Sequence, residues 1–515
     1  MTNHTTNHMA NNMAQWTKRI IGVLAAIFLA IFVVFTFGKK LFYSGGWGVL
    51  LSVSLISLVA LLMWFKPRLR LSPLWFGIIL AGITILPRVG WIRSSDIPPI
   101  SDFKIYHDIA VSLLNGKSVA DLYLVKFPHV IGYPLILSKV YRVFGSSVLV
   151  AQWWGVACTL ASVFILWRLV GRVSSDAAGR VAALIFALFP STIFYSTMVA
   201  TEPTFTLLFL LCTYLLVCAS SLTTSFVTNH ATNRALSVVS ILAMFGLIGV
   251  ISAFCNAVRP LAMIFLVAAV IYVLVKNANK KVFLGILGLA IMLMTYNVTA
   301  SLYRLYITPI IGGTPAKNSF GYTFLVSTNI ESRGMWNQAD TDCMRDLYNQ
   351  GHSPDEVNRI MRNKGLERIK SNLGEMPLHY ITKTAIMWGS DNDGLEWNLE
   401  STKKGGYGHV SGNIGLLKDL SGWYYRIVLV LALIMAISHL FRPDGDQWLF
   451  ALIVLGYAGA FMLTEVQGRY HYPTLPFLAA MAATAIVHVY GQPRRTAAIT
   501  STSRVTEMAE TSRQL

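Results

Sequence analysis

The chain has 515 residues, of which 54% are hydrophobic and only 13% are charged, and its formal net charge at pH 7 is +18. Soluble domains carry about 25% charged residues, so this composition excludes an ordinary soluble protein and indicates a chain whose solvent is largely lipid. A nucleic-acid binder would need its Lys and Arg on one soluble face, whereas here they lie mostly between apolar runs, as topology-setting charges do.

The N-terminal segment is polar and of low complexity, beginning MTNHTTNHMANN. We expect residues 1–19 to form a disordered cytoplasmic N-terminus. No small-residue cleavage site follows the first apolar run, so we interpret that run as an uncleaved span rather than a signal peptide. The five cysteines have no metal-binding spacing and give no disulfide framework.

Twelve apolar runs are candidate membrane spans, because a hydrocarbon core of about 30 Å needs roughly 20 apolar helical residues per crossing. The predicted fold class is therefore an all-α polytopic membrane protein, with a transmembrane region over 20–302 and C-terminal transmembrane helices over 425–490. The spans lie near 20–37, 48–65, 73–91, 147–167, 181–199, 203–220, 235–253, 260–276, 282–302, 425–441, 448–464 and 473–490.

Every short loop that an N-inside start places in the cytoplasm is basic, as the positive-inside rule requires. The short loops on the other side show no comparable bias, apart from Lys39 and Lys40. We therefore predict a multi-pass cell-membrane protein whose termini, including a tail over 491–515, are cytoplasmic. The basic residues are Lys18, Arg19, Arg234, Arg442, Arg494 and Arg495, and those within 66–70, 168–180 and 276–281.

Two outer-side segments, 92–146 and 303–424, are much longer than the other loops. Apolar residues recur at helical spacing from Phe103 onward, so we expect a helical first outer loop at the membrane surface. The second segment contains helix-like stretches over 355–372 and 376–388 between turn-rich sequences. It is short of apolar residues, so we expect a small cap packed on the spans rather than an independent domain.

Ionisable residues gather at the outer ends of the predicted spans. Charges at span edges are costly to place and are often functional. Because these residues come from distant parts of the chain yet fall on one leaflet, they predict an active site at the outer membrane face. They are Asp102 and Asp108 after the third span, Glu202 between the fifth and sixth, Arg259 between the seventh and eighth, and Glu465, Arg469 and His471 after the eleventh.

Each of these residues also has a purely structural explanation. Asp102 can cap a helix, and Asp108 falls on the polar face of that helix, where a solvated role is expected. Glu202 can open a span from its N-terminus, where a negative charge suits the helix dipole. Arg259 and Arg469 can extend to lipid headgroups. The shared placement of all five, rather than any one of them, favours a site.

An acid opposed by two arginines at a membrane surface suits an anionic lipid substrate and an acceptor that must lose a proton. An arginine can hold a phosphate through two parallel hydrogen bonds and stabilise the charge that develops as it leaves. A carboxylate within hydrogen-bond reach can take the proton of an attacking hydroxyl. Nucleotide sugars are generally confined to the cytoplasm, so an outward-facing sugar transferase needs a lipid-linked donor, and a polyprenyl-phosphate sugar fits this geometry.

Four short motifs carry a resemblance to a known group: SDFKIYHDIA with the downstream GYPLILSKVYRVFG; FPSTIFYSTMVATEP; NAVRPLA; and EVQGRYHYPTLPFLA. Their order and shared leaflet resemble the GT-C superfamily of integral membrane glycosyltransferases. The resemblance is in particular to the branch of protein O-mannosyltransferases and lipid A aminoarabinose transferases, and it covers roughly residues 73–490.

The resemblance implies transfer of a sugar from a polyprenyl-phosphate donor to an acceptor hydroxyl on the outer face of the cytoplasmic membrane. Asp102 matches the catalytic base of that superfamily, and Glu202 matches an acid that lines the same cavity. Arg259 and Arg469 match arginines expected near the donor phosphate, with Tyr470 flanking it. The partners implied are the lipid donor, the bilayer and an acceptor glycan, lipid or protein.

Three further residues complete the predicted substrate-binding set. Glu465 would orient Arg469, since residues at i and i+4 share a helix face. Tyr106 lies on the apolar stripe of the helix that Asp102 opens. Many relatives carry an Asp-Glu pair in this loop, whereas here Phe103 follows Asp102; this difference leaves the acceptor type open and keeps Asp108 as a second candidate base.

No metal ligands and no nucleotide-binding residues are predicted. The stretch from Asp391 to Asp393 resembles the D-x-D of soluble glycosyltransferases, but its turn-like WGSDNDG context predicts a solvated turn. The same holds for Asp340 and Asp342. The sequence contains no P-loop and no G-x-G-x-x-G. No cofactor is firmly implied, and a divalent-metal requirement stays open, as do the sugar and the acceptor.

Two other functional classes suit a chain of this layout. A secondary transporter would place its substrate charges near the bilayer midplane and would show related halves, whereas these charges gather at one face and the long outer loops break any symmetry. A polyprenyl-linked polysaccharide polymerase or ligase shares the arginine chemistry. It would transfer a pyrophosphate-linked oligosaccharide, however, and would need no aspartate in an early outer loop.

Overall fold

The computed structural model describes residues 2–65, 71–228, 234–277, 282–441, 443 and 445–488. This part of the chain is helical and contains no strand, and the predicted class, an all-α polytopic membrane protein, is confirmed. The predicted basic segments at 66–70, 278–281 and Arg442, and the predicted cytoplasmic tail, lie outside the described residues.

Seven of the described helices are long and apolar enough to cross a membrane. Three shorter apolar helices, α2 (Gly46–Phe65), α12 (Ala262–Lys276) and α20 (Trp448–Leu463), also lie where spans are predicted. The number of crossings stays a prediction. The seven are α1 (Thr2–Phe37), α3 (Pro73–Ser94), α7 (Val148–Val173), α10 (Glu202–Thr228), α11 (Arg234–Val258), α13 (Val282–Ile311) and α19 (Ile414–Phe441).

Two of the predicted elements differ in the structure. The predicted span at 181–199 is broken: α8 (Asp176–Ala187) meets the short helices α9 (Pro190–Phe194) and η1 (Tyr195–Thr197) at 51°. Pro190 causes the break, because a proline lacks an N–H group and disfavours helical backbone in the residue before it. At the N-terminus, α1 begins at Thr2 rather than after a disordered segment, since extending an existing apolar helix requires no new nucleation.

The interior of the bundle is formed around α21 (Leu475–His488), which packs against α8 and α19. Every side chain from Phe477 to Ala483 is fully buried. A helix that is apolar on all sides belongs inside a bundle, and its alanines let neighbouring helices approach closely. The residues that precede α21 are therefore held at a fixed place, and they form the short helix η2 (Gly468–Thr474), which carries Arg469.

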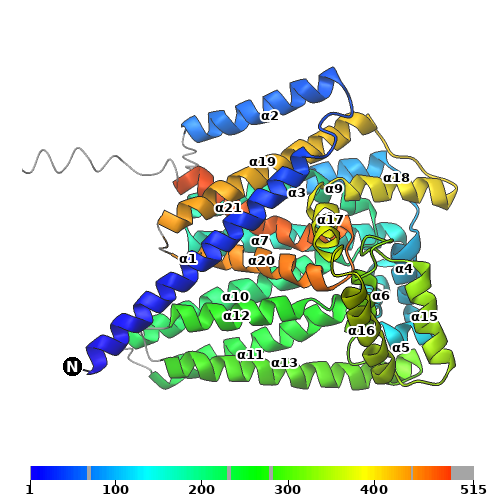
Figure 1. The fold of residues 1–515 in the computed structure, drawn as a ribbon. Coiled ribbons are helices and arrows are strands. Elements are labelled where there is room, and N and C mark those ends of the chain that lie inside the picture. The colour runs from blue at the N-terminus through cyan, green and yellow to red at the C-terminus, as the bar shows by residue number, and fades with distance from the viewer. Residues whose placement is uncertain are drawn as a thin grey trace, which may run out of the picture.

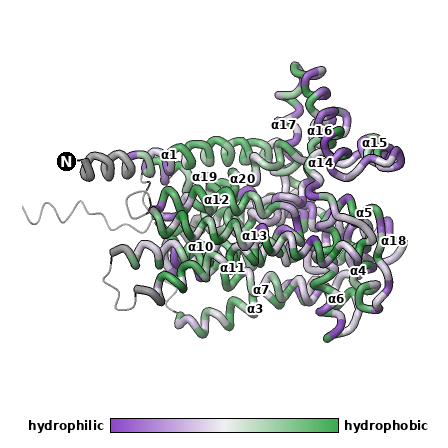
Figure 2. The backbone as a smooth tube through the Cα atoms, turned by 90° about the horizontal axis from the view of Figure 1, so that it is seen from below, coloured by the Kyte–Doolittle hydropathy of each residue, from purple (hydrophilic) through white to green (hydrophobic). Residues whose placement is uncertain are grey.

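The long loops gather at one end of the bundle, opposite the N-terminus, and we call this the loop end (Figure 1). Hydrophobic residues follow the bundled helices, and hydrophilic residues concentrate at the loop end (Figure 2). The predicted helical first outer loop is formed by α4 (Ser101–Leu114), α5 (Leu122–Lys126) and α6 (Gly132–Phe144). The second is formed by α14 (Phe320–Ser327), α15 (Gln338–Asn349), α16 (Pro354–Ser371), α17 (Met376–Trp388) and α18 (Asp393–Gly405).

The two loop regions contact each other and the spans. The backbones of Asp96 and His409 exchange two hydrogen bonds of 3.0 and 2.9 Å, which joins the first loop to the second. Helices α14 to α16 share a small apolar cluster of their own around Val326 and Met361. The hydroxyl of Ser327 donates to the carbonyl of Met462 at the end of α20, 3.2 Å away. The second region is thus a small helical cap seated on the bundle.

Candidate active site

Two acid–arginine pairs meet at the loop end, although their residues come from four separate parts of the chain. Nη2 of Arg469 lies 2.5 Å from Oδ2 of Asp102, and Nη1 of Arg259 lies 2.6 Å from Oε1 of Glu202. Both guanidinium groups lie over the ring of Tyr470, 5.3 Å from its centre for Arg259 and 5.8 Å for Arg469. We call these five residues the paired-charge cluster.

Asp102 stands in the first turn of α4, where the partial positive charge of the helix N-terminus favours a carboxylate. It is not the N-cap: that position is Ile100, which makes no side-chain cap, so the simple capping explanation of Asp102 is wrong. Ser101 has φ of 48°, a left-handed conformation that non-glycine residues adopt at a cost. This turn directs the Asp102 side chain to Arg469, and a third of its surface remains exposed.

Arg469 is held from several sides and is only 8% exposed. Its Nε donates to Oε1 of Gln467 over 2.9 Å, and its guanidinium carbon lies 5.1 Å from the ring centre of Trp397 and 5.4 Å from that of Phe103. Burial alone would lower the pKa of Arg469, but Tyr470, Glu202 and Asp102 raise it well above its ordinary value. The group is therefore a fixed cation whose nearest anion is Asp102.

Glu465 reaches Arg469 by a different route from the predicted one. It lies after the end of α20 in non-helical backbone, so it does not share a helix face with Arg469 and the i, i+4 argument is wrong. Its Oε1 accepts hydrogen bonds from Nε2 of Gln467, 3.0 Å away, and from the hydroxyl of Tyr470, 3.2 Å away. Gln467 thus links Glu465 to Arg469. Burial raises the pKa of Glu465.

Glu202 and Arg259 form the more deeply buried pair, with side-chain exposures of 1% and 13%. Glu202 is the first residue of α10. Arg259 directly follows the last residue of α11 and precedes Pro260. The hydroxyl of Thr201 donates to Oε2 of Glu202 over 3.3 Å and accepts from Nη1 of Arg259 over 3.4 Å. A buried pair with these added hydrogen bonds is a rigid element of the site.

Two first-loop residues lie close enough to this cluster for its charges to act on their pKa values. Burial raises the pKa of Tyr106 above its ordinary value, and the charge of Asp102 adds to the effect, so the phenol stays protonated. His129 is a residue that the sequence reasoning missed. Burial and then Arg259 lower its pKa to about 4, so its imidazole is neutral at pH 7. The sequence offers one signal for this residue: His129 lies just before the GYPLILSKVYRVFG motif, in the loop that is predicted to carry the site.

Asp108 lies apart from the cluster. Its Oδ2 lies 2.5 Å from Nζ of Lys104, and both side chains are more than half exposed. Among the described contacts, none joins Asp108 to Arg469 or Arg259. Of the two candidate bases on α4, only Asp102 is placed beside the arginines.

Behind η2 lies a second acidic group, formed by residues that the sequence predicted to be a solvated turn. That prediction is wrong, because Asp391 and Asn392 are only 4% and 3% exposed. Nε2 of His471 lies 2.9 Å from Oδ1 of Asp391, and the Asp393 carboxylate contacts the backbone at Gly468. Although burial opposes it, Asp391 raises the pKa of His471, and burial raises the pKa of Asp393 to about 7. These contacts fasten η2, and with it Arg469.

The solvated-turn prediction also fails for Asp340 and Asp342, since both lie in α15. Asp340 is 3% exposed, and its Oδ1 accepts from Nη2 of Arg368 over 2.8 Å. Asp342 pairs with Arg345 on the same helix. These residues stabilise the cap. Among the described residues, no group of three or more His, Cys, Asp or Glu side chains could hold a metal ion.

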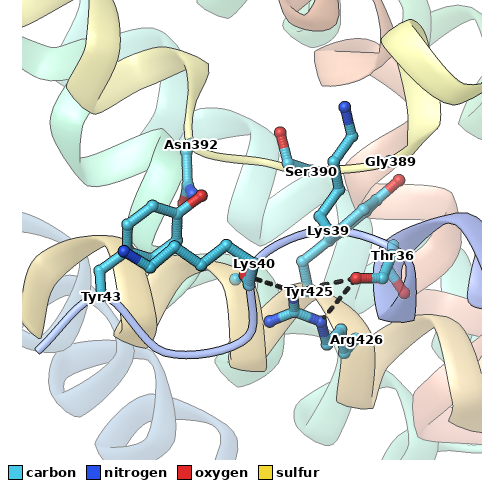
Figure 3. A pocket seen from close by; sticks show the side chains of 10 residues that line it. Thr36, Lys39, Lys40, Tyr43, Gly389, Ser390, Asn392, Tyr425 and Arg426 are labelled. Atoms are coloured by element: carbon cyan, nitrogen blue, oxygen red, sulfur yellow. Dashed lines mark hydrogen bonds between the residues drawn. The ribbon is translucent and has the colours of Figure 1, made fainter. Parts of the chain in front are cut away.

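Asn392 also lines a small hollow formed by the end of α1, the stretch that follows it, α19 and the segment between α17 and α18 (Figure 3). Arg426 crosses its floor and donates from Nε and Nη2 to the carbonyl of Thr36, over 3.1 and 3.0 Å. Nη2 also donates to the carbonyl of Lys40 over 3.3 Å. Because the Thr36 carbonyl lies in the last turn of α1 and Lys40 follows that helix, the arginine braces the end of α1 against α19.

Comparison with known proteins places the fold in context. No protein-family model and no curated protein matches the chain. Among solved structures, it is similar to the archaeal oligosaccharyltransferase AglB of Archaeoglobus fulgidus in complex with an inhibitory peptide and a dolichol-phosphate, with 14% identity and a TM-score of 0.46. The match covers 80% of this chain and 50% of that one.

A second Archaeoglobus fulgidus oligosaccharyltransferase structure, tethered with an acceptor peptide, matches 80% of this chain and 49% of its own, with 12% identity and a TM-score of 0.46. A third, in complex with Zn and sulfate, has 11% identity and a TM-score of 0.44, over 80% of this chain and 48% of its own. The chain spans about half the length of these proteins. All three are structures of oligosaccharyltransferases.

Proposed function

We propose that this chain is a membrane glycosyltransferase that moves a sugar from a polyprenyl-phosphate donor to an acceptor hydroxyl. The carrying observation is the 2.5 Å contact between Asp102 and Arg469, which puts a carboxylate and a fixed cation at one point of the loop end. In a direct displacement, the general base and the anchor of the leaving phosphate act on the same sugar, so both must lie within reach of its anomeric carbon. The resemblance of the surrounding motifs to the GT-C superfamily supports the same assignment.

Donor binding would change the partners of Arg469. A donor phosphate can take the guanidinium edge that now faces Asp102, because a charge-assisted fork onto phosphate is a strong and geometrically defined contact. Arg259, whose guanidinium lies 5.3 Å from the centre of the same Tyr470 ring, would add a second positive charge. The carboxylate of Asp102 would then be released to face the acceptor.

In the transfer step, the acceptor hydroxyl gives its proton to Asp102 as its oxygen forms a bond to the anomeric carbon. The bond between that carbon and the phosphate oxygen breaks, and the electron pair stays on the phosphate. Arg469 and Arg259 stabilise the charge that grows there, an effect that is strongest in a water-poor site. The products are the glycosylated acceptor and the polyprenyl phosphate, and the proton leaves Asp102 to solvent through its exposed third.

The remaining predicted residues would support these roles. Glu202 holds Arg259, and Glu465 holds Arg469 through Gln467 and fixes the hydroxyl of Tyr470. Tyr106, a neutral phenol facing the cluster, can donate a hydrogen bond to the sugar or the acceptor. With the basic loops in the cytoplasm, the loop end would face the extracytoplasmic side of the cell membrane.

Arg469 provides the direct test of the donor role. In proteoliposomes supplied with polyprenyl-phosphate mannose or glucose, we expect Arg469→Ala to lower kcat/KM by about 10²–10³-fold, the usual effect of removing one donor to a developing oxyanion. Arg469→Lys should recover little, since an ammonium cannot make the forked contact. The matched control is Arg359→Ala on the exposed side of α16. Unchanged donor dependence in both Arg469 variants would exclude its phosphate role.

The strained turn at Ser101 gives a second test. Glycine adopts the observed φ of 48° without steric cost, so we expect Ser101→Gly to keep transfer activity within about threefold. A β-branched residue adopts this backbone conformation only at a high steric cost. Ser101→Val should therefore displace Asp102 and reduce the rate by about 10- to 100-fold. Steady-state rates of the two variants in the same liposomes check this. Equal activity in both would show that the turn does not position the base.

A further inference from the structure

The middle of helix α17, between the buried apolar residues Met376 and Met387, has its polarity reversed for a helix of an exposed loop. Its buried face carries His379 and Lys383, which are 4% and 1% exposed. Its exposed face carries Leu378 and Ile381, which are 69% and 52% exposed, and Leu373 just before the helix is 66% exposed. Soluble loop helices place charged groups outward and apolar groups inward. A helix that buries its lysine and presents leucine to its surroundings is adapted to lipid.

The buried polar groups of α17 are fully used. Nζ of Lys383 donates to the carbonyls of Met462 and Thr464, over 2.9 and 3.0 Å, and to the hydroxyl of Ser327. Nε2 of His379 lies 2.8 Å from the carbonyl of Ser327. The two bonds from Lys383 to Met462 and Thr464 satisfy carbonyls at the C-terminal end of α20, where a helix leaves them unpaired. The inward polarity of α17 therefore has a structural cause, while its outward apolar face has no partner within the described chain.

The position of α17 gives the depth of that face. Helix α17 is seen almost end-on in Figure 1 and projects past α1 in Figure 2, so it lies across the axis of the bundled helices. At its C-terminal end, the ring of Trp388 stacks on Phe32 of α1, with centroids 4.2 Å apart and planes at 4°. Phe32 lies five residues, or about 7 Å, before the end of α1. A helix that crosses the spans at this level lies at the boundary between acyl chains and headgroups.

We propose that α17 is an interfacial helix that rests in the leaflet at the loop end, with Leu373, Leu378 and Ile381 in contact with lipid. Amphipathic helices of this kind bury their apolar face about 5–10 Å into the headgroup and acyl boundary. Because Lys383 binds the carbonyls on either side of Leu463, the same helix ties the segment that leads to Glu465 and Arg469 to the membrane surface. This seating is independent of the transfer chemistry, and it needs no substrate.

The test uses nitroxide labels on single added cysteines. Four of the native cysteines are buried, so Cys343→Ser removes the one partly exposed thiol of the described residues. Labels are placed in Leu378→Cys and Ile381→Cys. The matched control is Asp346→Cys, an exposed residue of α15, the helix at the far end of the loop region (Figure 1). Each protein is reconstituted in vesicles of phosphatidylethanolamine and phosphatidylglycerol, and collision with O₂ and with a water-soluble nickel chelate is measured by power saturation.

We expect the labels at 378 and 381 to be at least threefold more accessible to O₂ than to the nickel chelate, and the label at 346 to show the reverse. Because the labelled positions are exposed, the substitutions should not disturb the fold. The two α17 positions should give the same result if the whole face is in lipid. Chelate accessibility like that of the control at both positions would mean that the face is in water and would overturn the proposal. Dipolar broadening between labels at 378 would assign the face to a second copy and would overturn it equally.

Discussion

Replacing Asp102 with asparagine should reduce sugar transfer by about 10²–10⁴-fold while leaving membrane insertion and folding intact. Asparagine keeps the size of the side chain and can still accept a hydrogen bond from Nη2 of Arg469, so the local geometry is preserved. It cannot take the proton of the attacking hydroxyl. The loss should therefore appear in kcat, while the KM for the lipid donor should not rise, because the donor phosphate then competes with a neutral amide rather than a carboxylate for Arg469.

The matched control for this variant is Asp108→Asn, the same substitution on the same helix. Asp108 is more than half exposed and pairs with Lys104, so we expect its activity to stay within about twofold of the wild type. Rates measured with both variants in one proteoliposome preparation make the comparison. Full activity of Asp102→Asn would reject the assigned mechanism, and loss of activity in Asp108→Asn alone would transfer the role of base to Asp108.

The large features of the fold could be predicted from the sequence because lipid imposes a strong rule on it. Apolar runs of span length predict helices whatever their partners, and each of the twelve predicted runs is helical over most of its described length. The interfacial helix after Ile100 was also predictable, since its apolar stripe has helical spacing. The break in the span near Pro190 is the exception, and there a single proline outweighs an apolar run.

The contacts inside the site could be predicted only in part. Depth along the spans is readable from the sequence, so Asp102, Glu202, Arg259 and Arg469 could be placed at one end. Lateral pairing is not readable in this way, and the choice of Asp102 with Arg469 and Glu202 with Arg259 depends on how η2 lies against α4 and α10.

The local backbone conformation near the site was harder to predict from the sequence than the positions of the spans. Glu465 was expected to share a helix with Arg469, but the helix ends at Leu463, and the extended stretch that follows uses Gln467 as the link. The Asp391–Asp393 stretch has the composition of a turn, but it leads directly into α18, and packing of η2 and α19 over it buries Asp391 and Asn392. Burial of a turn is a property of tertiary packing, and no local pattern records it.

Breaking the Glu202–Arg259 pair should have the largest effect on stability. Glu202→Gln leaves a guanidinium that is 13% exposed without its counter-charge, and such a loss costs about 3–5 kcal/mol. We expect a clearly lower apparent midpoint of thermal unfolding in detergent. The matched control is Glu400→Gln, which breaks the exposed i, i+4 pair with Lys404 and should leave the unfolding midpoint nearly unchanged.

The double variant Glu202→Gln with Arg259→Gln separates the structural role of this pair from its role in the reaction. Removing both charges removes the uncompensated cation, so most of the lost stability should return, because a buried ion pair contributes little net stability relative to neutral groups. Transfer activity should not return, since the second positive charge facing the donor phosphate is absent. The unfolding midpoint and kcat/KM of the double variant are measured against both single variants, as in a double-mutant cycle. Recovery of both quantities would show that the pair only braces α10 against α11, and Glu202 and Arg259 would then have no part in substrate binding.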